Sequence, residues 1–199
     1  MKQKITYYLI VLLTLGFVIS CGKNGKNPVD NKGKDTYDRL IISEVHLLSV
    51  DSNKNWIEVY NPADTSFILT SMGMSNVWAW NILPPYIRRN GGYKLEPDNF
   101  LIICADSTKK PNAEFEYPAI QVASLSQLDK DGGYFRISTQ VGDDEIAEGF
   151  RYGNRDYTEK YKELCGDFVI DYCDSNMSYH RIYPYESMKY IYKYSAPGY

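Results

Sequence analysis

Apolar and polar residues alternate along most of this chain from about residue 38 onward. A period of two places successive side chains on opposite faces of a strand, and no long stretch shows the 3.6-residue period of an amphipathic helix. Turn-forming pairs and triplets rich in Gly, Asn, Asp and Pro separate the alternating runs. The expected strands are residues 40–48, 56–60, 67–74, 78–82, 100–104, 133–138, 146–152, 178–183 and 189–194. Many short strands at this spacing predict an all-β sandwich or barrel of about eight or nine strands.

One short helix is expected in the stretch 154–177, between two of these strands. Asp156 is placed to act as the N-cap, with Glu159 at the reciprocal position of a capping box. Gly166 is placed to end the helix, because glycine readily adopts the left-handed conformation found there.

The first twenty residues have the pattern of a secretory signal. Lys2 and Lys4 precede an almost wholly apolar run at 5–19, which ends in the sequence VISC (18–21). A basic start, a short apolar core and small residues at the end are typical of such signals. The last four residues resemble the bacterial lipobox, in which the signal is cut before a cysteine that then carries lipid. The resemblance implies that Cys21 is the lipid attachment site.

The expected organisation therefore has three parts: a signal peptide (1–20), a lipidated cysteine with a flexible basic tether (21–37) and one folded domain (38–199). Two alternatives stay open, a plain membrane anchor formed by residues 5–22 and free secretion after cleavage elsewhere. Gly22 follows the cysteine where inner-membrane retention would favour an aspartate. We therefore expect a cell-envelope protein held on the outer membrane of a Gram-negative bacterium, with its orientation undetermined.

The charge of the folded domain argues against nucleic acid as a partner. The whole chain carries a net charge of −3, but from Asp38 onward there are 16 basic and 23 acidic side chains, a net of −7. A body of this charge repels phosphate backbones. The membrane, reached through the lipid on Cys21, and an unknown protein or polysaccharide are the expected partners.

Three cysteines remain after Cys21. Outside the cytoplasm a pair of cysteines is normally oxidised. Cys165 and Cys173 lie eight positions apart and are the disulfide candidate, whereas Cys104 lies in the apolar run FLIIC and is expected to be a buried free thiol.

Four blocks in order resemble the lamin tail domain, an immunoglobulin-like β-sandwich family. They are LIISEV (40–45), NWIEVYNPADTSFILT (55–70), YKLEPDNFLIICAD (93–106) and SLSQLDKDGGYFRIS (124–138), with weaker matches at 145–153 and 178–182. The resemblance implies an immunoglobulin-like sandwich with one short helix in an insertion, and a binding or structural role. Ser71-Met72 replaces the Gly-Trp usual in the family, and Glu148 stands where an aspartate is usual. Glu44 and Glu58 match acidic positions of the family and are interpreted as hydrogen-bonding groups between strands.

Catalytic and metal-binding signals are weak. The chain has two histidines, His46 and His180, and lacks a nucleophile elbow, an HExxH motif or paired zinc cysteines. We therefore expect no enzyme, with a cryptic hydrolase using His180 as an alternative. No cofactor is expected; calcium is a weak candidate at Asp143, Asp144 and Glu145, which follow a glycine in a predicted turn.

Aromatic residues supply the candidate binding surface. The chain contains 19 tyrosines and three tryptophans. Tyr190, Tyr192 and Tyr194 alternate along a predicted strand, and Trp78 and Trp80 share a face. Such platforms stack on sugars or bind proteins when exposed, and pack in the core otherwise. The expected function is a noncatalytic adhesion or interaction module, with a glycan-binding surface lipoprotein as the alternative.

Overall fold

The computed structural model describes residues 37–47, 51–75, 81–109, 118–129, 131–171, 173 and 177–182, together with the backbone of 190–194. Residues Thr36–Tyr199 cluster as one unit, close to the expected start at Asp38. No helix in these described ranges is long and apolar enough to cross a membrane. The signal, Cys21 and the alternative anchor at 5–22 lie outside the described residues.

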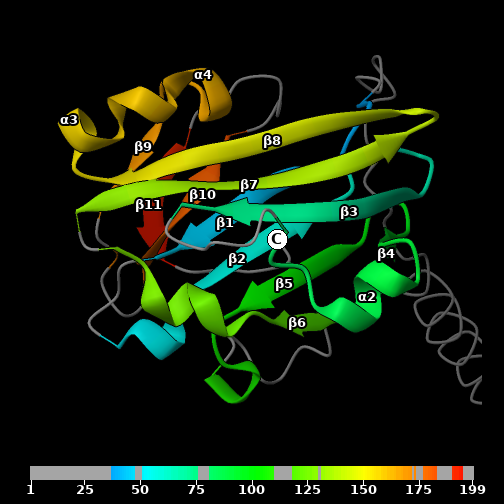
Figure 1. The fold of residues 1–199 in the computed structure, drawn as a ribbon, viewed down its shortest axis with the longest axis horizontal. Coiled ribbons are helices and arrows are strands. Elements are labelled where there is room, and N and C mark those ends of the chain that lie inside the picture. The colour runs from blue at the N-terminus through cyan, green and yellow to red at the C-terminus, as the bar shows by residue number, and fades with distance from the viewer. Residues whose placement is uncertain are drawn as a thin grey trace, which may run out of the picture. The chain divides into compact units, whose positions relative to one another are not determined.

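Two sheets form the domain (Figure 1). The six-stranded sheet has the order β11-β10-β1-β2-β5-β6 and the five-stranded sheet the order β4-β3-β7-β8-β9. Neighbouring strands are antiparallel except for the pairs β5–β6 and β8–β9, which are parallel. The strands are β1 (Ile41–His46), β2 (Trp56–Tyr60), β3 (Phe67–Met74), β4 (Tyr93–Leu95), β5 (Phe100–Cys104), β6 (Ala119–Gln121), β7 (Gly132–Val141), β8 (Asp144–Gly153), β9 (Val169–Ile170), β10 (Met177–Arg181) and β11 (Tyr190–Tyr194). The all-β sandwich is confirmed, with eleven strands among the described residues instead of eight or nine.

The core lies between the two sheets and follows from the alternation of apolar residues. Ile57 and Val59 of β2 are buried in it, as are Phe135 and Ile137 of β7. In β1 the pairing with β2 shifts between Ile42 and Glu44. An extra residue in one strand resets the alternation of its side chains. The shift therefore lets the apolar residues on both sides of it face the core.

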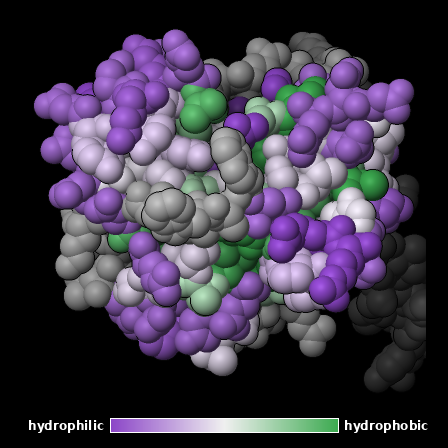
Figure 2. Space-filling model, in the orientation of Figure 1, coloured by the Kyte–Doolittle hydropathy of each residue, from purple (hydrophilic) through white to green (hydrophobic). Residues whose placement is uncertain are grey.

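Hydrophilic residues cover most of the face shown in Figure 2, and hydrophobic residues show only in patches between them. The fully buried side chains nevertheless include a charged one, Arg151 of β8. Candidate functional sites are therefore sought among the charged and polar side chains that the fold buries.

The expected helix exists but begins earlier and is broken into three short pieces. They are α3 (Arg155–Thr158), the 3-10 helix η4 (Glu159–Tyr161) and α4 (Lys162–Cys165). The N-cap is Asn154, not Asp156: its Oδ1 accepts hydrogen bonds from the backbone of Asp156 and Tyr157, at 2.9 and 3.4 Å. Gly166 ends α4 as expected, with a φ of 71° and its N–H donating to Lys162 O at 2.7 Å.

Four further helical turns lie in the loops that the structure describes. They are η1 (Ser52–Lys54), α2 (Pro85–Arg89), η2 (Ser107–Lys109) and η3 (Ala123–Gln127). The Pro84-Pro85 pair has the composition of a turn, yet Pro84 is the N-cap of α2 and Pro85 its first residue. Proline is favoured in the first turn of a helix, where its missing N–H costs nothing, so the pair begins a helix here.

Candidate functional site

A polar cluster lies on the face of the six-stranded sheet that points away from the core. Glu44 of β1 is paired in register with Glu58 of β2 on one side and with His180 of β10 on the other. The three side chains are almost completely buried, with relative exposures of 2%, 2% and 5%. Buried charges are costly without partners. The hydrogen bonds of these three side chains therefore show whether the cluster has a structural or a chemical role.

Ser178, His180 and Glu44 contact one another. The Ser178 hydroxyl donates to Glu44 Oε1, and Ser178 Oγ lies 2.9 Å from His180 Nε2. The same Nε2 lies 3.2 Å from Glu44 Oε1. Since the hydroxyl proton goes to the glutamate, His180 Nε2 is the donor to both oxygens.

This geometry differs from that of a hydrolytic triad. In a triad the histidine accepts the serine proton at one ring nitrogen and donates to the carboxylate from the other. Here the serine and the carboxylate share one ring nitrogen, and the Ser178 side chain has an exposure of 0%. The cluster therefore joins β1 and β10 by hydrogen bonds and does not present an activated nucleophile.

Neighbouring polar residues on the same face are also held between strands. Ser43 donates to Glu58 Oε1 at 2.6 Å, which joins β1 to β2. His46 Nδ1 lies 2.6 Å from Met177 O, so this nitrogen carries the proton, and the ring stacks on Trp56 with centroids 5.9 Å apart. Burial lowers the pKa of His46, and its hydrogen bond to Met177 partly opposes that shift. His46 is therefore neutral in the folded protein near pH 7.

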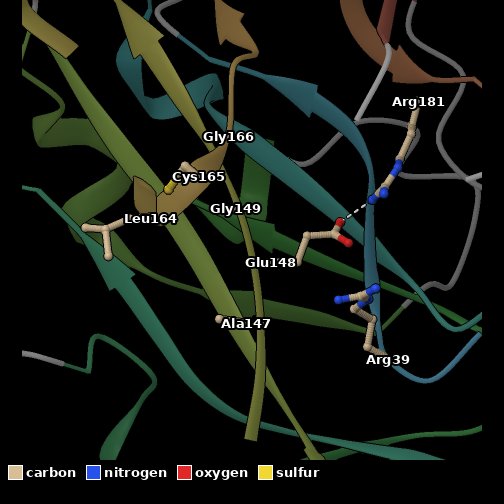
Figure 3. Close-up of a pocket in the computed structure, with 8 residues that line it drawn as sticks. All are labelled: Arg39, Ala147, Glu148, Gly149, Leu164, Cys165, Gly166 and Arg181. Carbon is tan, nitrogen blue, oxygen red and sulfur yellow. Dashed lines mark hydrogen bonds and ion pairs between the residues drawn. The ribbon is translucent and has the colours of Figure 1, made fainter. Parts of the chain in front are cut away.

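A pocket of about 240 Å³ opens beside β8 (Figure 3). Glu148 lies in it and accepts hydrogen bonds from Ile42 N, at 2.6 Å, and from Arg181, with which it forms a buried ion pair. Burial raises the pKa of Glu148, and Arg181 opposes this shift. The lining residues are Arg39, Ala147, Glu148, Gly149, Leu164, Cys165, Gly166 and Arg181.

The pocket is lined by paired charges and contains no activated thiol. Arg39 pairs with Asp38 at 3.2 Å and Arg181 pairs with Glu148, so both guanidinium groups that line the pocket already have acidic partners. Burial raises the pKa of the Cys165 thiol to about 12, so it is protonated at neutral pH, and thiols react as thiolates. The volume lies below the roughly 300–1,000 Å³ of pockets that enclose drug-sized ligands. The pocket therefore has room for a small group only.

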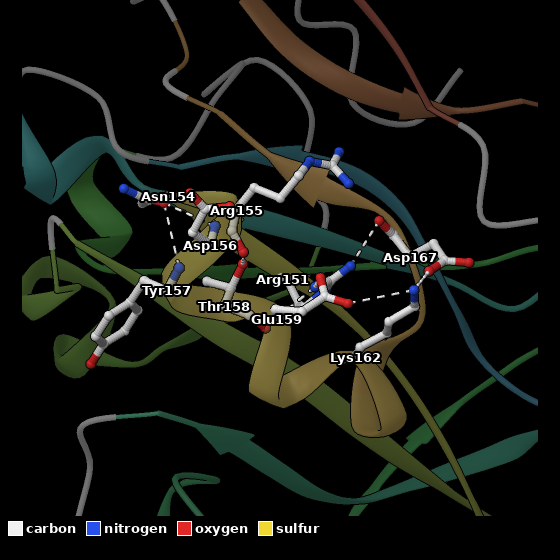
Figure 4. Close-up of polar contacts among 9 residues, drawn as sticks. All are labelled: Arg151, Asn154, Arg155, Asp156, Tyr157, Thr158, Glu159, Lys162 and Asp167. Atoms are coloured by element: carbon white, nitrogen blue, oxygen red, sulfur yellow. Dashed lines mark hydrogen bonds and ion pairs between the residues drawn. The ribbon is translucent and has the colours of Figure 1, made fainter.

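The helical segment after β8 is attached to the sheet by Arg151 (Figure 4). Its Nη1 lies 3.3 Å from Thr158 O and 2.9 Å from Glu159 Oε2, and its Nη2 lies 2.9 Å from Asp167 O. Its side chain is 1% exposed, whereas that of Glu159 is 55% exposed. Arg151 is thus a structural clamp with no access for a ligand.

The expected disulfide between Cys165 and Cys173 is wrong. Both cysteines are buried free thiols, as is Cys104, which was expected to be one. Cys165 Sγ lies 3.8 Å from Phe135 O in the five-stranded sheet, whereas Cys173 Sγ lies 3.8 Å from Val45 O in the six-stranded sheet. Closeness in sequence does not bring the thiols together because the chain crosses from one sheet to the other between them.

The structure does not gather the weak calcium candidates. Asp143 and Asp144 lie exposed where β7 turns into β8, and Glu145 accepts hydrogen bonds from Thr70 and Ser71 of β3. Within the described ranges, no three His, Cys, Asp or Glu side chains lie close enough to hold a metal ion.

The aromatic candidates remain predictions. Tyr190, Tyr192 and Tyr194 do lie on a strand, β11, which pairs with β10, but the description of 190–194 is limited to the backbone. Trp78 and Trp80 lie outside the described residues. The glycan-binding alternative built on them is therefore a prediction from the sequence.

The Arg39–Glu148–Arg181 pocket and the Arg151 clamp were not expected from the sequence. Arg151 lies in an alternating run at a position that indicates solvent, but it is buried, and the folded segment 154–167 contacts it. The one local signal was Glu148, noted as a departure from the lamin tail pattern. Its partners lie 106 and 33 positions away in the chain.

Comparison of the chain with protein-family models, with curated proteins and with solved structures gives no match. The resemblance to the lamin tail domain therefore rests on the sequence blocks alone.

Proposed function

We propose that this protein is a bacterial envelope lipoprotein, lipidated on Cys21, that holds a noncatalytic lamin-tail-like β-sandwich at a membrane as an adhesion or interaction module. The observation that carries the noncatalytic part is the Ser178–His180–Glu44 network. Its hydroxyl has an exposure of 0% and donates to a carboxylate, so it is neither accessible nor activated.

The other buried ionic groups support the same role, because protein groups already bind them. Glu148 is bound by a backbone N–H and by Arg181, and Arg151 is bound by two carbonyls and by Glu159. Removing one partner of a buried ion pair leaves an uncompensated charge, so the fold holds such groups in place, whereas catalytic groups must meet the substrate. The fold thus uses these charges for its architecture.

The anchoring part is supported by the signal pattern that ends at Cys21. One acyl chain binds a membrane only marginally, so stable attachment needs a second chain or another signal. Bacterial lipoproteins carry two or more chains on the cysteine, and the lipobox resemblance implies that arrangement here. The acidic domain, repelled by anionic head groups, would then be free to meet a partner.

Radiolabelled fatty acid tests the anchor. Cells that express the full-length chain are expected to label it and to retain it in the membrane fraction, whereas the Cys21→Ala variant loses the label. The Cys104→Ala variant is the matched control and keeps both the label and the membrane location. Equal labelling of the Cys21→Ala variant would contradict the proposal.

Substrate screening tests the noncatalytic part. The purified protein is expected to leave chromogenic esters, phosphate esters and glycosides unchanged. Turnover that is present in the wild-type protein and absent from a folded His180→Ala variant would overturn it in favour of a hydrolase.

A further inference from the structure

Two tyrosine rings on the helical segment after β8 contact the ammonium of one lysine. Lys160 Nζ lies 4.5 Å from the ring centroid of Tyr157 and 4.8 Å from that of Tyr161. Both distances lie within the roughly 6 Å over which the face of an aromatic ring attracts a cation. Hydrogen bonding with Tyr161 raises the pKa of Lys160, so this side chain is charged at neutral pH. The position beside the two rings therefore favours a cation.

The two rings are held in place by the sheet that they cover. Tyr134 of β7 packs against Tyr161, with ring centroids 4.9 Å apart and ring planes inclined by 54°. Thr158, which lies between the two tyrosines in the chain, is fully buried, and its carbonyl accepts a hydrogen bond from Arg151. A ligand site that is already fixed in position loses less entropy when it binds. The attachment to the sheet therefore prepares both rings for a ligand.

The site is open to solvent. Tyr157 is 39% exposed, and Figure 4 shows its ring pointing away from the contacts that Arg151 makes. The nearby carboxylate of Glu159 pairs with Arg151 and Lys162. In the described part of the chain, the contacts of the Lys160 ammonium are to the two tyrosine rings, and its side chain is exposed. Because a lysine side chain is flexible, its ammonium can move from the rings into water and leave both rings to another cation.

We propose that Tyr157 and Tyr161 bind a quaternary ammonium group, such as that of choline or of trimethylated lysine, in the place that the Lys160 ammonium occupies. A primary ammonium is compact and strongly hydrated, whereas a quaternary ammonium presents methyl groups to the rings and is the cation that aromatic sites recognise. The net negative charge of the folded domain also attracts a cation. Lys160 then acts as an internal competitor of the ligand. This inference goes beyond the proposed function, because the site requires neither the lipid on Cys21 nor an adhesion partner.

NMR titration of the full-length protein in a maltoside detergent, which carries no ammonium group, tests this inference. The probe is choline, and the comparison compound is the neutral alcohol in which a carbon atom replaces the choline nitrogen. Choline is expected to shift the amide resonances of residues 155–162 saturably, with a Kd of about 1–10 mM, because two partly exposed rings supply the attraction. The neutral alcohol is expected to bind at least about tenfold more weakly, since it has the same shape but no charge.

Variants of the protein locate the site. Tyr157→Leu is expected to weaken choline binding at least about fivefold, whereas Tyr157→Phe keeps the ring face and binds like the wild type. Lys160→Ala removes the internal competitor and is expected to tighten choline binding about two- to fivefold. Lys54→Ala makes the same change of net charge at an exposed position on η1, and Tyr86→Leu removes an exposed tyrosine on α2. These two control variants are expected to leave the Kd unchanged.

Two further ligands distinguish the possible sources of the ammonium group. Glycerophosphocholine carries it as a lipid headgroup does, and a short peptide with a trimethylated lysine carries it as a modified protein does. Tighter binding of one assigns the site to that source, and equal binding shows that the ammonium group alone is recognised.

The inference is overturned if choline binding does not saturate by ~100 mM, if the neutral alcohol binds as tightly as choline, or if Lys160→Ala weakens the binding of choline. The proposed function has separate readouts, lipid labelling and the substrate screen. Those results would stand if choline failed to bind.

Discussion

Replacement of Arg151 tests whether one buried guanidinium holds the helical segment on the five-stranded sheet. Arg151→Leu keeps an apolar stem in the buried position and removes the donors to Thr158 O and Asp167 O. Glu159→Gln is the matched variant, because it removes only the exposed partner of the same guanidinium.

The expected cost follows from the contacts. Thr158 O is buried, so the loss of its donor costs about 1–3 kcal/mol, and the part-buried Asp167 O adds less. The apolar stem of leucine regains part of this cost. The wild-type Arg151 Nε is itself buried without a hydrogen-bond partner in the described part of the chain, which lowers the net value of the arginine. We expect Arg151→Leu to lower the free energy of unfolding by about 3 kcal/mol. For a domain of this size that is a fall in Tm of about 6–12 °C. Glu159→Gln is expected to change Tm little, since exposed ion pairs contribute little.

Thermal unfolding and hydrogen exchange together read out this prediction. In Arg151→Leu the amides of residues 155–167 should exchange faster than in the wild type, whereas the amides of β7 keep most of their protection. Arg151→Lys should lie between the two, because one ammonium does not reproduce the planar fork that spans both carbonyls. If Glu159→Gln proved as destabilising as Arg151→Leu, the ion pair and not the backbone contacts would hold the segment.

Three further predictions concern the interior of the sandwich. The pKa of His46 is lowered in the folded state, so below pH 6.5 the unfolded chain takes up a proton that the folded protein does not. The free energy of unfolding therefore falls as the pH drops below 6.5, by at most about 1.4 kcal/mol per pH unit. Chemical unfolding between pH 5 and 8 should show a shallower slope in His46→Asn, which retains a donor near Met177 O, and equal slopes would contradict the assignment. Gly133→Ala places a Cβ 1.8 Å from Ser75 Oγ and should lower the free energy of unfolding by about 1–3 kcal/mol in urea titrations, unless β7 shifts as a whole. Thiol titration of the lipidated protein should give almost no reaction in the native state and three reactive thiols in the unfolded state. Detection of one thiol in the unfolded state would instead indicate a disulfide between Cys165 and Cys173.

The longer strands were predictable because alternation is a local property of the sequence. The ranges 56–60, 67–74 and 100–104 coincide with β2, β3 and β5. The strands β4, β6 and β9 were missed, since two or three residues are too few to show a period. Such short strands form because a longer neighbour offers its backbone, which no local pattern reports.

The buried polar groups were less predictable than the strands. The sequence indicated Glu44 and Glu58 as hydrogen-bonding groups between strands, and the structure shows those bonds. It did not indicate the Glu148–Arg181 pair, because nothing local says that positions 33 apart meet between the sheets. The error at Cys165 has the same origin: spacing fixes the length of a loop but not the sheet on which each end lies.

Two of the three contacts that Arg151 makes to the segment 154–167 are to carbonyl oxygens of the main chain. A main-chain oxygen is present whatever side chain its residue carries, so sequence drift in that stretch leaves the attachment intact. The stretch is therefore suited to loop grafting. A foreign loop of similar length that places two main-chain carbonyl oxygens within hydrogen-bonding distance of the Arg151 guanidinium should pack against the domain without redesign of either sheet. An epitope or tag inserted there would sit on the domain while the interior that defines the fold stays untouched.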